Sequence, residues 1–106
     1  MEHSQTEAND VVLLRLFIAG SSSRSLRAIE AVRRMCCDLL DHGVKVEIVD
    51  VLQQADEAER DKILATPTLI RQLPGPPRRL VGDVTEPYRV VELLGLQEHL
   101  RRRDAT

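Results

Sequence analysis

The sequence predicts a single mixed α/β domain with the element order βαβαββα. A length of 106 residues suits one domain, and a hydrophobic content of 42% is enough for a packed core. In the first half, an apolar run, a segment of helical periodicity and an alternating segment follow one another, as in two parallel strands joined by a helix. In the second half, two short apolar segments flank a proline-rich turn and predict a hairpin. We expect this domain over residues 11–100, with a flexible tail at residues 1–10 and a basic tail at residues 101–106.

The first strand is expected over residues 11–19, which are apolar apart from Arg15 and are followed by Gly20. Such a nearly continuous apolar run predicts a central strand that is covered on both faces. Serines at positions 21–23 can cap the helix that follows, and we expect this helix to end near Gly43, which can adopt the left-handed conformation. Its apolar face is expected to contain Leu26, Ile29, Val32, Cys36, Leu39 and Leu40.

The second strand is expected over residues 44–51, where apolar and charged residues alternate at first. The helix before it is long enough for a right-handed crossover, so the first two strands should be parallel neighbours. Residues 55–64 are helix formers and mostly polar, which predicts a short helix lying largely in solvent. Its acidic residues are interpreted as a solvated face rather than as an acid–base pair; they are Asp56, Glu57, Glu59 and Asp61.

The hairpin is expected from strands at residues 69–73 and 78–81, joined by the Pro-Gly-Pro-Pro turn between them. A last helix should follow, with Asp83 or Thr85 as its cap. This final segment is ambivalent, because it contains adjacent valines, which prefer strands, and Gly95, which weakens a helix.

This order of elements is that of thioredoxin-like proteins, which place a redox dithiol at the start of the first helix. Here that position holds serines and no cysteine. Cys36 lies about three turns further along the helix and is interpreted as a small core residue, while Cys37 is expected to be exposed and without a role. We therefore expect a protein without catalytic residues, and a thioredoxin-like oxidoreductase is the rival interpretation.

Composition argues against several other classes of protein. A net charge of −2 and an aromatic content of 2% are unfavourable for binding nucleic acid. No apolar run reaches the roughly 18 residues of a membrane span, and the polar N-terminal segment does not resemble a signal peptide. We expect a cytoplasmic location. The three histidines have no ligand-type spacing, so neither a metal nor a cofactor is expected.

Two arginine-containing segments are candidates for binding. The loop at residues 20–25 could hold an anion with the help of Arg24 and Arg27, although a simple capped turn explains it as well. Arg78 and Arg79 follow the proline turn, and because successive strand residues point to opposite faces, at least one should be exposed. An arginine on a rigid strand suits bidentate contacts with the carboxylates of a partner.

Several motifs resemble those of the KaiB family. Residues 62–69 read KILATPTL and residues 77–83 read PRRLVGD, after FIAG at residues 17–20 and VDVL at residues 49–52. KaiB proteins are non-catalytic components of the cyanobacterial circadian clock. The resemblance implies binding to a KaiC-type ATPase, with KaiA as a further partner where it exists.

The resemblance also implies two alternative folds, because the KaiB family is metamorphic. The second fold, βαββααβ, assembles into tetramers, so a dimer or tetramer is expected in that state. Prolines can isomerise slowly enough to separate two such states. The positions expected to matter for the switch or for the structure are Gly20, Pro67, Pro74, Pro77, Gly82 and Asp83.

The resemblance further implies that family residues contacting KaiC fall on five basic positions: Arg27, Lys62, Arg71, Arg78 and Arg79. The sequence departs from the family pattern at Ser21–Ser25, which replaces Asn-Thr-Pro-Asn-Ser, and at Arg101–Arg103, which replaces an acidic tail. These departures indicate a KaiB-like paralogue. An adaptor that binds a histidine kinase or another ATPase is the alternative function.

Overall fold

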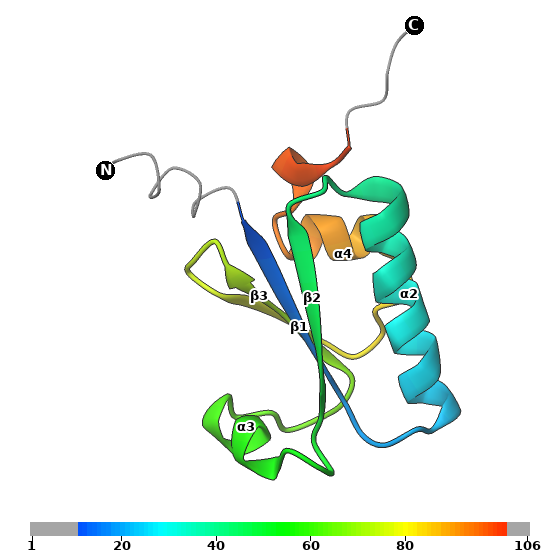
Figure 1. Ribbon diagram of the computed structural model, residues 1–106, viewed down its shortest axis with the longest axis vertical. Coiled ribbons are helices and arrows are strands. Elements are labelled where there is room, and N and C mark those ends of the chain that lie inside the picture. The colour runs from blue at the N-terminus through cyan, green and yellow to red at the C-terminus, as the bar shows by residue number, and fades with distance from the viewer. Residues whose placement is uncertain (1–10, 102–106) are drawn as a thin grey trace, which may run out of the picture.

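The computed structural model describes residues 11–101, and the predictions about the two tails lie outside this range apart from Arg101. The predicted fold class is confirmed: the domain is a mixed α/β, thioredoxin-like arrangement of strands and helices (Figure 1). A short 3-10 helix follows the last α-helix. The elements are β1 (Val12–Ile18), α2 (Ser23–Leu39), β2 (Val44–Asp50), α3 (Ala55–Arg60), β3 (Thr68–Leu73), β4 (Arg78–Val81), α4 (Pro87–Leu93) and η1 (Gln97–His99).

The four strands form one sheet in the order β2-β1-β3-β4. Strand β1 is parallel to β2 and antiparallel to β3, and β3 pairs with β4 as an antiparallel hairpin. The expectation of a central first strand is therefore confirmed. Its alternate residues Leu14 and Leu16 are fully buried on the face that carries α2 and α4, whereas Phe17 is buried on the opposite face.

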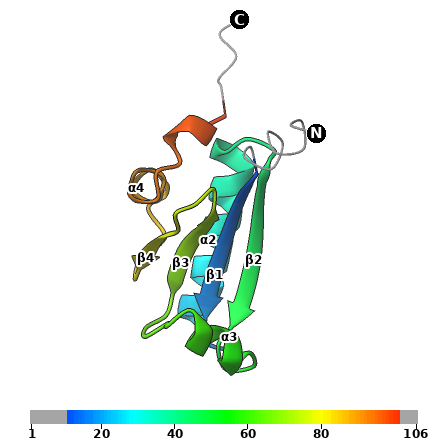
Figure 2. The same ribbon diagram turned by 90° about the vertical axis from the view of Figure 1, so that its left-hand side faces the viewer.

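The two faces of the sheet are covered unequally. Helices α2 and α4 lie side by side on one face and enclose the larger core, which includes Val32, Val90 and Leu94 (Figures 1 and 2). On the other face, a small cluster of Phe17, Val49 and Ile70 packs beneath the segment around α3. Helix α3 lies at the carboxyl ends of β1 and β2 and contains no buried residue, as expected for a solvent-exposed helix.

Helix α2 begins as predicted but differs in its buried face and its end. Ser22 is the N-cap, and its hydroxyl accepts a hydrogen bond from the Ser25 amide at 3.2 Å. Leu26, expected in the core, is 55% exposed. The buried positions in this part of the helix are Ser25 and Ala28, each one residue before the expected Leu26 and Ile29. The expected glycine cap at Gly43 is wrong, since the helix ends at Leu39 with Leu40 in an extended conformation. The buried residues of α2 are Ser25, Ala28, Val32 and Met35.

Two further helix boundaries differ from prediction. Helix α3 ends at Arg60 instead of residue 64, because the backbone turns at Lys62, whose φ is 55°. Helix α4 takes its N-cap at Glu86 and has no side-chain cap. The predicted caps are wrong because Asp83 Oδ1 accepts hydrogen bonds from the Thr85 amide and hydroxyl, at 2.9 and 2.6 Å, in the turn before the helix.

Candidate functional site

Arg71 and Arg78 converge on one face of the β3–β4 hairpin. They are directly paired in the register, so both side chains point to the face that carries α4. Arg71 Nη1 donates to the Gly95 carbonyl at 3.3 Å and Nη2 to the Pro76 carbonyl at 3.0 Å, while Arg78 Nη1 lies 3.5 Å from the Leu93 carbonyl. These two guanidinium groups therefore occupy the carboxyl end of α4, where the helix dipole favours positive charge.

Gly95 allows this close approach. Its φ is 66°, a conformation that L-residues with a side chain rarely adopt. A Cβ atom at this position would lie 2.6 Å from Arg78 Nη1 and 3.3 Å from Arg71 Nη1. The glycine thus ends α4 and leaves room for both arginine side chains.

Arg79 and Lys62 meet on the opposite face of the sheet. Arg79 donates from Nη2 to the Asp61 carbonyl at 2.7 Å and from Nη1 to the Lys62 carbonyl at 3.2 Å. Both carbonyls follow the last turn of α3, so Arg79 satisfies the end of that helix as a cationic cap. The side chain of Lys62 is exposed beside it.

The charges of the three hairpin arginines are not neutralised within the described part of the chain. Residues 11–101 place no carboxylate within ion-pair distance of Arg71, Arg78 or Arg79. A guanidinium carries five N–H donors, so several remain open on the exposed Arg78 and Arg79, whereas Arg71 is partly buried and its Nε lies out of contact with solvent. Beside Arg78 and Arg79 lies a hollow of about 300 Å³, also lined by Asp61, Ile70, Gln72 and Pro77. Lys62, Arg71, Arg78 and Arg79 thus lie on both faces of the hairpin, around the edge strand β4, and we call this set of residues the hairpin basic surface.

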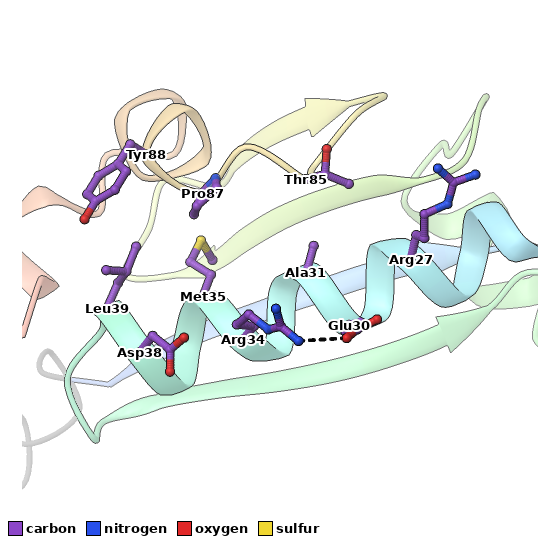
Figure 3. Close-up of a pocket in the computed structure, with 10 residues that line it drawn as sticks. All are labelled: Arg27, Glu30, Ala31, Arg34, Met35, Asp38, Leu39, Thr85, Pro87 and Tyr88. Carbon is purple, nitrogen blue, oxygen red and sulfur yellow. Dashed lines mark hydrogen bonds and ion pairs between the residues drawn. The ribbon is translucent and has the colours of Figure 1, made fainter.

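Arg27, the fifth predicted contact residue, lies apart from this surface. It is exposed on α2 and lines a groove of about 390 Å³ between that helix and the segment leading into α4 (Figure 3). Met35 and Leu39 on the helix face Pro87 and Tyr88 across the groove. The five predicted residues are therefore distributed over the two faces of the hairpin and one separate helix.

Arg15 carries the most extensive ion-pair network in the described chain, and sequence reasoning did not assign it a role. From the centre of β1, it contacts Glu57, lies 2.8 Å from Asp61 Oδ2 through Nη1, and lies 3.3 Å from Glu47 Oε1 through Nε. Its guanidinium carbon also lies 5.2 Å from the centre of the Phe17 ring. Two features of the sequence could have predicted this network. Arg15 is the one charged residue in an otherwise apolar strand, and the helix after the second strand is rich in acidic residues that can pair with it.

The predicted structural positions lie at turns. Gly20 has a φ of 68°, and its amide donates to Asp50 Oδ1 at 2.9 Å. Pro67 directly precedes β3 and is buried. Its carbonyl accepts a hydrogen bond from the Gly82 amide at 2.9 Å, which joins the start of β3 to the end of β4. Pro74 and Pro77 lie in the turn of that hairpin. Hydrogen bonds from Thr85 lower the pKa of the adjacent Asp83 below its usual value, with smaller contributions from Arg89 and Arg24.

The two cysteines lie in the second half of α2, away from its start. The serines at the start of α2 form a capped turn, in which the hydroxyl of Ser25, in the first turn of the helix, donates to the Ala19 carbonyl at 3.0 Å. Cys36 is half-buried against the core, and burial together with the neighbouring Cys37 raises the pKa of its thiol to about 11. Cys37 is exposed, as predicted.

The described residues contain neither a cluster of metal ligands nor a membrane-spanning helix. Within residues 11–101, no three side chains of His, Cys, Asp or Glu are grouped so that they could hold a metal ion. None of the helices in that range has the length and apolar character needed to cross a membrane.

Comparison with known proteins gives consistent matches over most of the chain. Residues 15–96 match the KaiB domain family. The circadian clock protein KaiB3 of Synechocystis is 48% identical over 85 residues, covering 80% of this chain and 81% of that protein. A circadian clock oscillator protein KaiB of Prochlorococcus marinus is 39% identical over 89 residues, covering 84% of this chain and 83% of that protein.

Solved structures resemble the fold at lower identity. The N-terminal domain of SasA from Synechococcus elongatus has a TM-score of 0.67 at 22% identity, covering 86% of this chain and 90% of that domain. A chloroplastic thioredoxin z has a TM-score of 0.68 at 23% identity, covering 92% of this chain and 91% of its own. These likenesses support the thioredoxin-like fold.

Proposed function

Because the chain belongs to the KaiB family, we propose that it is a non-catalytic regulatory protein that docks on a KaiC-type ATPase through the hairpin basic surface. In this proposal it modulates circadian or related timing from the cytoplasm. KaiA is a further partner where it is present. A homodimer or tetramer belongs to the alternative fold.

The observation that carries the proposal is the unneutralised charge of the three hairpin arginines. Their guanidinium groups lie within hydrogen-bond distance of backbone carbonyls at the carboxyl end of α4 and in the segment after α3. Since residues 11–101 place no carboxylate within ion-pair distance of these guanidinium groups, a carboxylate of a partner can add a charge-assisted, bidentate contact to them. An acidic patch on an ATPase ring has the matching chemistry.

The non-catalytic part of the proposal is supported by the absence of a thiol at the start of α2, where thioredoxins carry theirs. It is tested by a disulfide-reduction assay, in which we expect no turnover. Thiol-dependent reduction that is lost in Cys36→Ser or Cys37→Ser would instead support the oxidoreductase interpretation.

Charge reversal tests the docking surface. We expect the double variant Arg78→Glu/Arg79→Glu to bind a KaiC-type ATPase at least about tenfold more weakly, because two attractive charges become repulsive. The matched control is Arg33→Glu/Arg34→Glu, which makes the same change in net charge on the exposed side of α2. Affinity is measured by fluorescence anisotropy, and far-UV circular dichroism checks that both variants remain folded.

The two pairs of variants distinguish the possible outcomes. A loss of affinity in the hairpin variant alone supports the proposed surface. An equal loss in both variants would indicate a nonspecific effect of net charge and would contradict it, as would unchanged affinity in the hairpin variant. Retention of a histidine kinase and not of the KaiC-type ATPase in a pull-down would support the adaptor alternative.

A further inference from the structure

The attachment of the α3 segment to the sheet depends on charge more than on apolar packing. None of the six residues of α3 is buried, and Ile63, which packs against the small cluster on this face, is itself only partly buried. Arg15 reaches from β1 to Glu57 within α3 and to Asp61 directly after it. The Arg15 side chain is only 15% exposed, so solvent screens these ion pairs less than it screens pairs on the open surface.

Asp61 connects this ion-pair network to the hairpin basic surface. Its carboxylate contacts Arg15, and its backbone carbonyl accepts the 2.7 Å hydrogen bond from Arg79. The next carbonyl, that of Lys62, accepts the second hydrogen bond from Arg79. The location of the Arg79 guanidinium is thus set by a backbone turn that Arg15 holds against the sheet.

We propose that Arg15 is a positioning residue, which acts through Asp61 to hold Arg79 where it can meet the carboxylates of a partner. Arg15 itself is largely enclosed by Glu47, Glu57, Asp61 and the Phe17 ring and is not a contact residue. The inference rests on the proposed function for its partner-binding consequence. The link from Arg15 to Arg79 is a property of the free protein and can be tested without any partner.

The first experiment observes the guanidinium of Arg79 in the free, isotopically labelled protein. Two hydrogen bonds from its Nη groups should slow rotation about the Nε–Cζ and Cζ–Nη bonds and give resolved side-chain signals at low temperature. We expect these signals to broaden or merge in Arg15→Gln and, to a smaller extent, in Arg15→Lys, which keeps the charge but cannot hold two carboxylates in a fork. The control Arg34→Gln removes an exposed ion pair with Glu30 and should leave them unchanged.

The second experiment is a double-mutant cycle on binding to a KaiC-type ATPase. We expect Arg15→Gln to weaken binding about threefold to tenfold and Arg79→Gln to weaken it at least as much. If Arg15 acts through Arg79, the double variant binds no more weakly than Arg79→Gln alone. Additive losses would show that Arg15 contributes by another route and would overturn the inference.

A second variant keeps the test valid if Arg15→Gln fails to fold. Asp61→Asn retains Arg15 with its other two carboxylates and the backbone carbonyl that receives Arg79, and should produce the same losses to a smaller degree. Unchanged Arg79 signals in both Arg15→Lys and Asp61→Asn would overturn the inference. If the Arg79 signals respond but neither Arg79→Gln nor Arg78→Glu/Arg79→Glu alters binding, the proposed docking surface fails while the link from Arg15 to Arg79 stands.

Discussion

At the scale of single residues, the hairpin arginines donate hydrogen bonds within the fold and also carry positive charges that a partner can contact. Arg71 and Arg78 satisfy carbonyls at the end of α4, and Arg79 satisfies carbonyls after α3. These bonds use backbone acceptors that would otherwise face solvent, and they leave the positive charges without a counter-charge in residues 11–101. Sequence reasoning could predict that at least one of the adjacent arginines is exposed, and both are.

The two adjacent cysteines should differ sharply in reactivity. The pKa of Cys36 is raised from 9.0 to about 11, so its thiolate fraction at pH 8 is about a hundredfold lower than that of an ordinary thiol. We expect Cys36→Ser, which retains the exposed Cys37, to react rapidly with a disulfide reagent, and Cys37→Ser to react slowly. Spectrophotometric thiol titration measures both rates. Similar rates in the two variants would contradict the assignment of Cys36 as a core residue.

Asp83 provides a prediction about pH. Thr85 donates two hydrogen bonds to its carboxylate and lowers its pKa, so the interaction stabilises the fold above the unfolded-state pKa and is lost as the pH falls through the folded-state value. Thr85→Val removes the hydroxyl donor and should raise the pKa of Asp83 toward its usual value. Carbon NMR of the carboxyl group between about pH 6 and 2 measures the shift, with Thr85→Ser as the control that keeps the hydroxyl. An unchanged titration curve in Thr85→Val would refute this explanation.

At the scale of elements, the junction of α4 with the hairpin depends on Gly95. Gly95→Ala requires a φ near 66° that costs an alanine about 1–2 kcal/mol, and the new Cβ would displace the end of the Arg78 side chain. We therefore expect the free energy of unfolding to fall by about 1–2 kcal/mol, as measured by urea denaturation.

Gly75→Ala is the matched control for this substitution. Gly75 lies in the hairpin turn, and an added Cβ there has no atom within 4 Å. Its effect on stability should be within about 0.5 kcal/mol of zero. Equal destabilisation by the two substitutions would contradict the specific role of Gly95.

The existence and type of the elements could be predicted more reliably than their ends. Alternation and helical periodicity reflect which face is buried, and they correctly placed β2, β4 and most of α2. The caps were wrong because Asp83 and Thr85 bond to each other and because Leu40 leaves the helix in an extended conformation that pairs with Leu100. Such choices depend on tertiary neighbours that local sequence does not specify.

At the scale of the whole molecule, two strand pairs follow from local rules: the crossover through α2 makes β1 and β2 parallel, and the short turn between β3 and β4 makes them antiparallel. The antiparallel pairing of β3 with β1 does not follow from these rules, because α3 also connects β2 to β3. The positions of the basic residues on the two faces of the hairpin could not be predicted in the same way. Arg78 and Arg79 are adjacent in sequence but point to opposite faces, where they meet the ends of different helices. The acidic residues around α3, expected to be a solvated face, were partly misjudged because Glu57 and Asp61 pair with Arg15 from a distant strand.

The central claim, that the hairpin basic surface is the docking face, is tested most directly by mapping the contacts of a KaiC-type ATPase on the isotopically labelled protein by NMR. The account predicts that amide signals of residues 61–63, 70–82 and 93–96 shift or broaden first, while those on the exposed side of α2 around Arg33 remain unaffected. Perturbations confined to α2 or to the free edge of β2, with the hairpin signals unchanged, would contradict it.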